Sequence, residues 1–284
     1  MDTKTVEFAV RYQRLMRALD FIEQHIDRRH RWFRQRAIAL CHHRFFPYEP
    51  LHDLIVESCA ESLDKNDNKR FWELWKLNFK CSIDDYYVYP SMDAQWVSRH
   101  VLIPKPQILD TLRDSGGLVL TYHFHHQNSL CCVLGELGLK VWAIANRPES
   151  SPLFPYIGNW ARRLNSLTRQ HFQGGEYLYT DDLRSIALAL PGIFQARNAL
   201  ICLVDVHQPS PRSPRTRIFN REIQAPIGVI ESALRAQSAI YLAYLTPNLG
   251  ARQHHSGEFA YELAIELIEQ QESSSVLEDR KSVV

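Results

Sequence analysis

The chain has 284 residues, of which 45% are hydrophobic and 23% are charged, and its formal net charge is +1. A chain of this size and composition can bury a full hydrophobic core, as one large domain or two small ones. The near-zero net charge gives no reason to expect nucleic acid as a partner, and no apolar run is long enough to predict a transmembrane span.

The six cysteines contain no Cys-x-x-Cys pair, and the first residues are charged rather than apolar. This pattern is typical of reduced thiols in a protein without a secretory signal. We therefore expect a cytoplasmic protein, with peripheral contact at the inner membrane left open.

Residues 1–100 are predicted to form a helical region that packs on the rest of the chain. Apolar residues recur there at steps of three and four, at Leu15, Met16, Leu19, Ile22 and Ile26. A further helix is expected at 69–80, after a polar loop at 64–68.

The pattern changes at Gly116, where short apolar runs begin to alternate with helical stretches. We expect strands at 118–122, 140–145, 177–180, 199–205 and 240–245. Helices are expected at 127–137, 152–164, 182–196, 226–237 and 258–271. This alternation predicts an α/β fold for residues 101–272, a mixed, largely parallel sheet flanked by helices, followed by a short polar tail at 273–284.

Several polar residues follow the predicted strands. His123, His125 and His126 come after the first strand, Arg147 after the second, and Asp205 with His207 after the fourth. Ligands of such sheets bind at the carboxyl ends of the strands, so these residues are the candidate site.

The histidine cluster has two chemical interpretations. His123 and His125, together with Asp205 and His207, are suitable ligands for zinc or iron, which would indicate a metal-dependent hydrolase. Alternatively, His123 is a general base, and Asn128, about one helical turn away, orients its imidazole. A nearby arginine would then stabilise the oxyanion or a phosphate.

The chain also resembles a known family over 117–245. The resemblance is carried, in order, by GLVLTYHF at 117–124, IANRP at 144–148, DLRSIALAL at 182–190, LVDVHQ at 203–208 and the segment that starts APIG at 225–228. These segments are similar to those of the bacterial lipid A late acyltransferases, within the wider lysophospholipid acyltransferase group.

The resemblance implies acyl transfer from acyl carrier protein or coenzyme A, without a metal or a covalent intermediate. It aligns His123, Arg147 and Asp205 with the family's histidine, arginine and aspartate. Three departures are expected to matter: Asn128 stands where the family has an acid, the family's N-terminal membrane anchor has no counterpart here, and the family's usual carboxyl-terminal segment has none either. Together they favour a small soluble or carrier-bound acceptor, an amine, hydroxylamine or hydroxyl, over membrane-embedded lipid A.

The remaining predictions concern substrate contacts. We expect His125, His126 and His207 to line the substrate site. Ten arginines and no lysines lie between Arg147 and Arg221, and Arg212, Arg215 and Arg217 are expected to meet the phosphate of the phosphopantetheine or coenzyme A thioester. No bound cofactor is expected. A protein that binds an acyl chain without catalysis is the further alternative.

Overall fold

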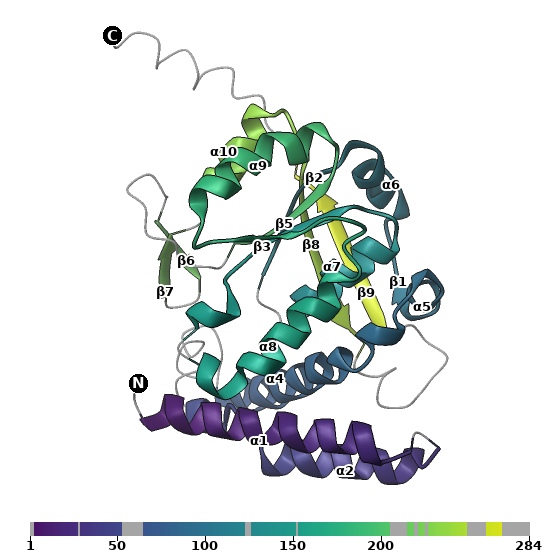
Figure 1. Ribbon diagram of the computed structural model, residues 1–284, viewed down its shortest axis with the longest axis vertical. Helices are drawn as coiled ribbons and strands as arrows, with labels where there is room; N and C mark the ends of the chain where they lie inside the picture. Colours follow the sequence, from purple (N-terminus) through teal and green to yellow (C-terminus); the bar gives the residue numbers. More distant parts are fainter. Residues whose placement is uncertain are drawn as a thin grey trace.

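The computed structural model describes residues 3–27, 29–52, 65–122, 126–151, 153–204, 215–218, 221–224, 227–248 and 260–268. Figure 1 shows two parts, a layer of long N-terminal helices and an α/β unit built on a seven-stranded sheet. None of the helices in these ranges is long and apolar enough to cross a membrane.

The N-terminal layer is built from helices α1 (Thr3–His25), α2 (Arg31–Arg44) and α4 (Lys65–Tyr86), with the short turn η1 (Glu49–Leu51) between them. The helix predicted at 69–80 is confirmed as the middle of α4. The loop predicted at 64–68 is wrong for residues 65–68, which form the first turn of α4, and residue 64 lies outside the described residues.

Aromatic side chains form the core of this layer. The rings of Trp72 and Trp75 stack at 5.4 Å, and Phe46 packs edge-on against Trp72 at 5.7 Å. Helix α8 (Phe154–Arg169) closes this core, and its Leu164 also packs against the core under the sheet. The helical layer is thereby joined to the α/β unit through α8 (Figure 1).

The α/β unit begins with η2 (Tyr89–Ser91), α5 (Ala94–His100), β1 (Val101–Leu102) and α6 (Pro106–Ser115). It continues through β2 (Gly117–Thr121), α7 (Gln127–Glu136), β3 (Val141–Ala145), η3 (Pro148–Ser150), α8, β4 (Tyr177–Tyr179), α9 (Leu183–Gln195) and β5 (Ala199–Leu203). It ends with the hairpin of β6 (Arg215–Ile218) and β7 (Arg221–Gln224), then α10 (Ile227–Arg235), β8 (Ile240–Pro247) and β9 (Tyr261–Leu267).

The main sheet has the strand order β1-β9-β8-β2-β5-β3-β4. All neighbouring pairs are parallel except β8 with β9. Helices cover both faces: Val119 of β2 packs with α7, whereas Leu118 and Leu120 pack with α9 and α10. The predicted mixed, largely parallel sheet flanked by helices is confirmed.

Central strand β2 is buried along its whole length and starts at a tight turn after α6. Gly116 has a φ of +65°, and a Cβ there would lie 2.2 Å from the backbone carbonyl carbon of Arg197. Only glycine fits this combination of positive φ and close backbone approach. This turn sets where β2 begins and therefore where its carboxyl end delivers the chain.

The last predicted helix, at 258–271, is wrong. Residues Tyr261–Leu267 form β9, which pairs antiparallel with β8. Tyr261, Leu263 and Ile265 are buried, whereas Glu262 and Glu266 are exposed, which is the alternation of a strand. The glutamates had suggested a helix because they recur every four residues, but a spacing of four also keeps them on one face of a strand.

Candidate active site at the carboxyl edge of the sheet

A pocket of about 390 Å³ lies where β2, β3 and β5 end. Thr121 closes β2, Asn146 follows β3 directly, and Leu203 closes β5, and all three residues line the pocket. The first turn of α7 contributes Gln127 and Asn128. The pocket therefore occupies the sheet edge at which the sequence predicts the site.

The chain passes the pocket on both sides of the predicted base. His123 and His125 lie outside the described residues, but Thr121 before them and Asn128 after them both line the pocket. The segment that carries His123 is thus bounded by two residues of the pocket wall. The orientation of the His123 imidazole stays a prediction.

The polar groups of the pocket are neutral. Among the described residues that line it, no side chain is charged at neutral pH, and amides and hydroxyls are contributed by Gln127, Asn128, Asn146, Thr121, Thr180 and Tyr177. The rest of the wall is largely apolar. The buried Oε1 atom of Gln127 has no hydrogen-bond partner among the described residues, so the pocket wall holds a polar atom that a ligand could satisfy.

Two cysteines, Cys131 of α7 and Cys202 of β5, also line the pocket. Burial raises the pKa of each thiol to about 12. A nucleophilic cysteine needs a lowered pKa, because the thiolate is the reactive form. Both thiols are therefore neutral at physiological pH and form part of the apolar wall of the pocket. The described cysteines form no disulfide.

Arg147 follows Asn146 but does not belong to the pocket wall. It donates from Nε to Oδ2 of Asp181 at 2.7 Å, and its guanidinium lies 4.3 Å from the ring centre of Tyr179. The side chain is about half exposed. An ion pair and a stacked ring hold the predicted catalytic arginine next to the pocket, with its charge already matched by a carboxylate.

His126 lies in the interior, on the opposite side of α7 from the pocket wall, and is only 2% exposed. It donates from Nδ1 to Oδ2 of Asp85 at 2.8 Å, and its Nε2 lies 3.0 Å from the side-chain oxygen of Asn78. Both ring nitrogens thus have protein partners. This placement favours a structural role for His126 over the predicted contact with substrate.

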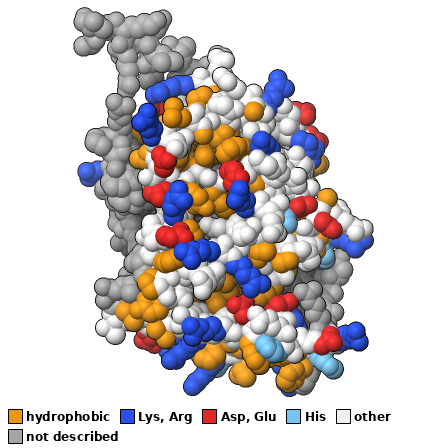
Figure 2. Space-filling model, viewed as in Figure 1, with side chains coloured by type: hydrophobic (Ala, Val, Ile, Leu, Met, Phe, Trp, Pro, Cys, Tyr) orange, Lys and Arg blue, Asp and Glu red, His pale blue; other side chains and the backbone are white. Residues whose placement is uncertain are grey.

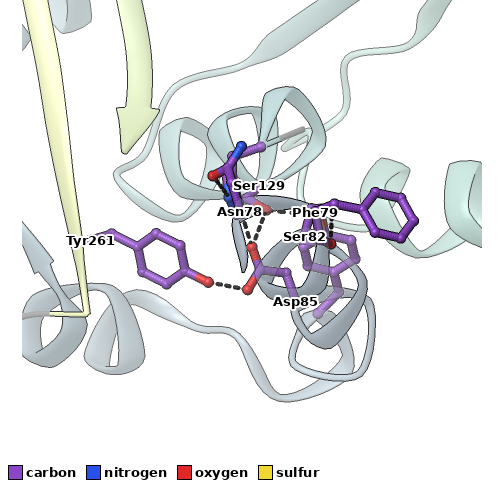
Figure 3. Close-up of polar contacts among 8 residues, drawn as sticks. Asn78, Phe79, Ser82, Asp85, Ser129 and Tyr261 are labelled. Atoms are coloured by element: carbon purple, nitrogen blue, oxygen red, sulfur yellow. Dashed lines mark hydrogen bonds and ion pairs between the residues drawn. The ribbon is translucent and has the colours of Figure 1, made fainter. Parts of the chain in front are cut away.

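Asp85 is the centre of this buried network and is 1% exposed (Figure 3). Besides the His126 hydrogen bond, it accepts one from the Ser129 hydroxyl at 3.0 Å and one from the Tyr261 hydroxyl. Ser129 in turn lies 2.9 Å from the Tyr89 hydroxyl. The network joins α4, the first turn of α7 and the start of β9, so it holds the helix that presents Asn128 to the pocket.

The sequence reasoning missed Asp85 and Asn78. Their signal was weak: Asp85 stands beside Asp84 in a helix that is otherwise rich in aromatic and apolar residues, and a carboxylate on such a helix needs a partner when it is buried. Glu136, at the end of α7, pairs with Nδ1 of His171 at 2.7 Å.

The other predicted site residues are only partly described. Asp205, His207 and Arg212 lie outside the described residues. Arg215 and Arg217 both belong to β6 of the β6–β7 hairpin, and Arg215 is exposed. Whether they form a phosphate-binding patch stays a prediction.

The metal interpretation also stays open. Within the described part of the chain, no group of three or more His, Cys, Asp or Glu residues is placed to hold a metal ion. However, the proposed ligands His123, His125, Asp205 and His207 all lie outside that part.

No model of a known protein family matches this chain, and a search of curated proteins finds no match either. The similarity to the lipid A late acyltransferases therefore depends on the five sequence segments described above.

Proposed function

We propose that this chain is an acyltransferase that moves an acyl group from a carrier thioester to a small acceptor. The observation that carries the proposal is the neutral, largely apolar pocket whose wall includes Thr121 and Asn128, the residues that flank the His123 segment. Its volume falls within the range of about 300–1,000 Å³ typical of small-ligand sites. An apolar wall with a few neutral hydrogen-bonding groups suits an acyl chain ending in a thioester.

In the proposed reaction, His123 takes a proton from the acceptor while the acceptor nitrogen or oxygen attacks the thioester carbonyl carbon. The tetrahedral oxyanion then collapses, the carbon–sulfur bond breaks, and the imidazolium returns the proton to the leaving thiolate. No covalent enzyme intermediate is required. Asp205 stays a proposed catalytic residue, because the resemblance aligns it with the family's aspartate.

In this arrangement, neutral hydrogen-bond donors of the pocket wall are better suited than Arg147 to stabilise the oxyanion. Gln127 and Asn128, whose amides are neutral donors, belong to the pocket wall, whereas Arg147 is engaged by Asp181. Preorganised donors aimed at a developing oxyanion contribute strongly to catalysis. We assign Arg147, with Arg212, Arg215 and Arg217, to the phosphate of the carrier or of coenzyme A.

The proposed donor is acyl carrier protein or coenzyme A, and we place the reaction in the cytoplasm or at the cytoplasmic face of the inner membrane. We favour an amine or hydroxylamine acceptor, because the family acid is replaced by Asn128. Such an acceptor attacks a thioester with less help from the base than a hydroxyl needs. The product would be a tailored small metabolite.

The test is turnover of acyl thioesters by the purified protein in the presence of a small-molecule extract, followed by mass spectrometry. We expect a new acylated metabolite and loss of thioester. His123→Ala should abolish both, whereas His30→Ala, a change at an exposed histidine of the N-terminal layer, should leave both unchanged. Equal activity in the His123→Ala variant would show that another residue is the base.

The same pocket also favours a second function, the binding of an acyl chain without catalysis. The two functions differ in their products: a binding protein would retain the thioester intact and show equal acyl affinity in the His123→Ala variant. Thioester loss that depends on stoichiometric zinc or iron, and that chelation abolishes, would instead support the metal-dependent hydrolase.

A further inference from the structure

A second cleft lies in the N-terminal helical layer, with a volume of about 880 Å³ and no residue in common with the pocket at the sheet edge. Its walls come from α1, the end of α2, the chain around η1 and one face of α4. We call it the α2–α4 cleft and define it by its basic residues Arg11, Arg44, Arg70, Lys76 and Lys80, together with His42.

Positive charge in this cleft exceeds negative charge. Against its five lysines and arginines, the lining has two carboxylates, Glu49 and Glu73. Arg11 pairs with Glu7 of its own helix, and Lys76 pairs with Glu73 at 2.7 Å. These ion pairs match only part of the positive charge of the cleft.

The other three basic residues, Arg44, Arg70 and Lys80, have no ion-pair partner within the described part of the chain. Some exposed arginines elsewhere do: Arg162 pairs with Glu149, and Arg169 pairs with Glu176. Figure 2 likewise shows basic and acidic side chains interspersed across the middle of the face drawn. Other exposed arginines, such as Arg99 and Arg184, also have no ion pair among the described residues. The α2–α4 cleft differs in that three such basic residues line one hollow.

Helix geometry places two of these charges along one side of α4. Arg70, Leu77 and Lys80 follow one another along α4 at steps of seven and three residues, which place them on one face of the helix. Arg44 closes α2 on the facing wall. Unpaired like charges held near one another repel, and an anion bound among them relieves that repulsion.

His42 gives an independent indication of a ligand. It lines the cleft but is only 7% exposed, and neither of its ring nitrogens has a hydrogen-bond partner among the described residues. Its Nε2 lies 3.5 Å from Oδ1 of Asp84, which is ion-pair range for a protonated imidazole but not a hydrogen bond. Buried polar atoms without a hydrogen bond are rare in native structures and point to a missing partner.

We propose that the α2–α4 cleft binds a phosphate monoester. The phosphate would lie among Arg44, Arg70 and Lys80, with the His42 ring at the base of the cleft. Arginine forks bind phosphate oxygens in pairs, and a phosphate dianion offers enough oxygens and charge for several cations, whereas a single carboxylate needs only one. Phe46, Leu74 and Leu77 form an apolar wall for the organic part of the ligand.

This site does not depend on the proposed acyl transfer, and its test needs no turnover. Phosphate monoesters occur both as soluble metabolites and as lipid headgroups, so two probes are needed. Binding of glycerol 3-phosphate is measured by calorimetry on the full chain. Co-sedimentation is measured with phosphatidylcholine vesicles that contain phosphatidic acid or lack it.

The decisive variant is the double change Arg70→Ala with Lys80→Ala. We expect it to weaken binding of whichever probe the protein binds by roughly tenfold or more, because it removes two charge-assisted contacts. The matched control is Arg169→Ala with Arg235→Ala, which removes two exposed, ion-paired arginines outside the cleft. His42→Asn should also weaken binding, and circular dichroism checks the fold of each variant.

Binding of glycerol 3-phosphate that follows this pattern supports a soluble ligand. Binding confined to the phosphatidic acid vesicles, with the same dependence on Arg70 and Lys80, supports a lipid headgroup. The proposal is overturned if neither probe binds, or if the control variant loses as much affinity as the cleft variant, which would indicate attraction by net charge alone.

Discussion

The two sides of helix α7 differ in the hydrogen bonding of their polar groups. One side turns Gln127, Asn128 and Cys131 towards the pocket, where the polar groups are neutral and the Gln127 oxygen has no partner among the described residues. The other side turns Ser129 towards Asp85 (Figure 3). His126 also bonds to Asp85 there, and these polar groups are buried and hydrogen-bonded.

This difference separates the residues that hold α7 in place from the residues that are candidates to bind a ligand. Polar groups that are satisfied inside the protein keep α7 in place and have no capacity left for a ligand, whereas the Gln127 oxygen on the pocket side has no partner among the described residues. A catalytic group must be held close to its productive geometry by residues whose own positions are fixed. The Asp85 network is therefore the support, and the amides of the pocket wall are the candidate contacts.

The largest expected effect comes from removing the centre of the support. Asp85→Ala should lower the free energy of unfolding by about 3–5 kcal/mol, because it leaves the buried His126 without its carboxylate. Urea unfolding measures this. The control Asp110→Ala breaks an exposed pair with Arg113 and should cost about 0–1 kcal/mol. Similar losses in the two variants would mean that the network does not hold the helix.

The reactivity of Cys131 tests whether the pocket wall is as apolar as it looks. With its pKa raised by burial from 9.0 to about 12, the thiol should be alkylated by iodoacetamide at pH 8 about a thousandfold more slowly than in the unfolded chain, a difference of about 4 kcal/mol. Mass spectrometry of peptides reads out each site. The partly exposed Cys41 should react before Cys131, and equal rates at these two cysteines would refute a neutral, enclosed wall.

The same raised pKa sets a stability trend with pH. The neutral thiol is favoured in the fold, so its contribution to stability is fully present below pH 9 and is lost as the pH rises towards about 12. Thermal unfolding between pH 8 and pH 11 should therefore show a falling midpoint. Cys131→Ala should flatten part of that fall.

Adjacent residues on the two sides of α7 give a matched pair of variants. Ser129→Ala removes hydrogen bonds to Asp85 and Tyr89 and should destabilise the protein by about 1–3 kcal/mol. Asn128→Ala should change stability by less than about 0.5 kcal/mol but reduce acyl transfer. Denaturant titration and thioester turnover, measured on both variants, separate the two roles. The opposite result, in which Asn128→Ala destabilises the protein and Ser129→Ala lowers acyl transfer, would contradict the assignment of Asn128 to the pocket and of Ser129 to the Asp85 network.

The smallest expected effect distinguishes the acceptors. With an amine or hydroxylamine acceptor, Asn128→Asp should change the rate by less than about tenfold, or roughly 1.4 kcal/mol of barrier. With a hydroxyl acceptor, the restored carboxylate should raise the rate far more, because general-base assistance contributes about 10²–10⁴-fold. The rate must be measured with the native acceptor. A gain of a hundredfold would contradict the amine proposal.

Most elements of the α/β unit could be predicted because their local patterns are strong. The strands at 118–122 and 140–145 and the helices at 127–137 and 182–196 match β2, β3, α7 and α9 to within one or two residues. In each of these segments, the length and spacing of the apolar residues suit either a strand or a helix, but not both. The segment at 258–271 failed because its spacing of four residues suits both a helix and a strand.

The candidate site, too, could be predicted from the sequence only in part. The position of the pocket followed from strand order along the chain, since the carboxyl ends of parallel strands meet at one edge. The partners of His126 did not follow, because Asp85 is 41 residues earlier in the sequence and Tyr261 lies in the segment predicted as a helix. Without the pairing of β8 with β9, no pattern brings Tyr261 to Asp85.

The sequence by itself determined the α/β class, the place of the first buried strand and the polar cluster that follows it. Apolar periodicity is a local property, and a short stretch of chain carries it completely. Only the tertiary structure decided which histidine is enclosed, which acid meets it and which arginines remain unpaired. Those outcomes depend on burial and on hydrogen bonds between residues far apart in the chain, and a buried polar group must find its partner wherever the fold places one.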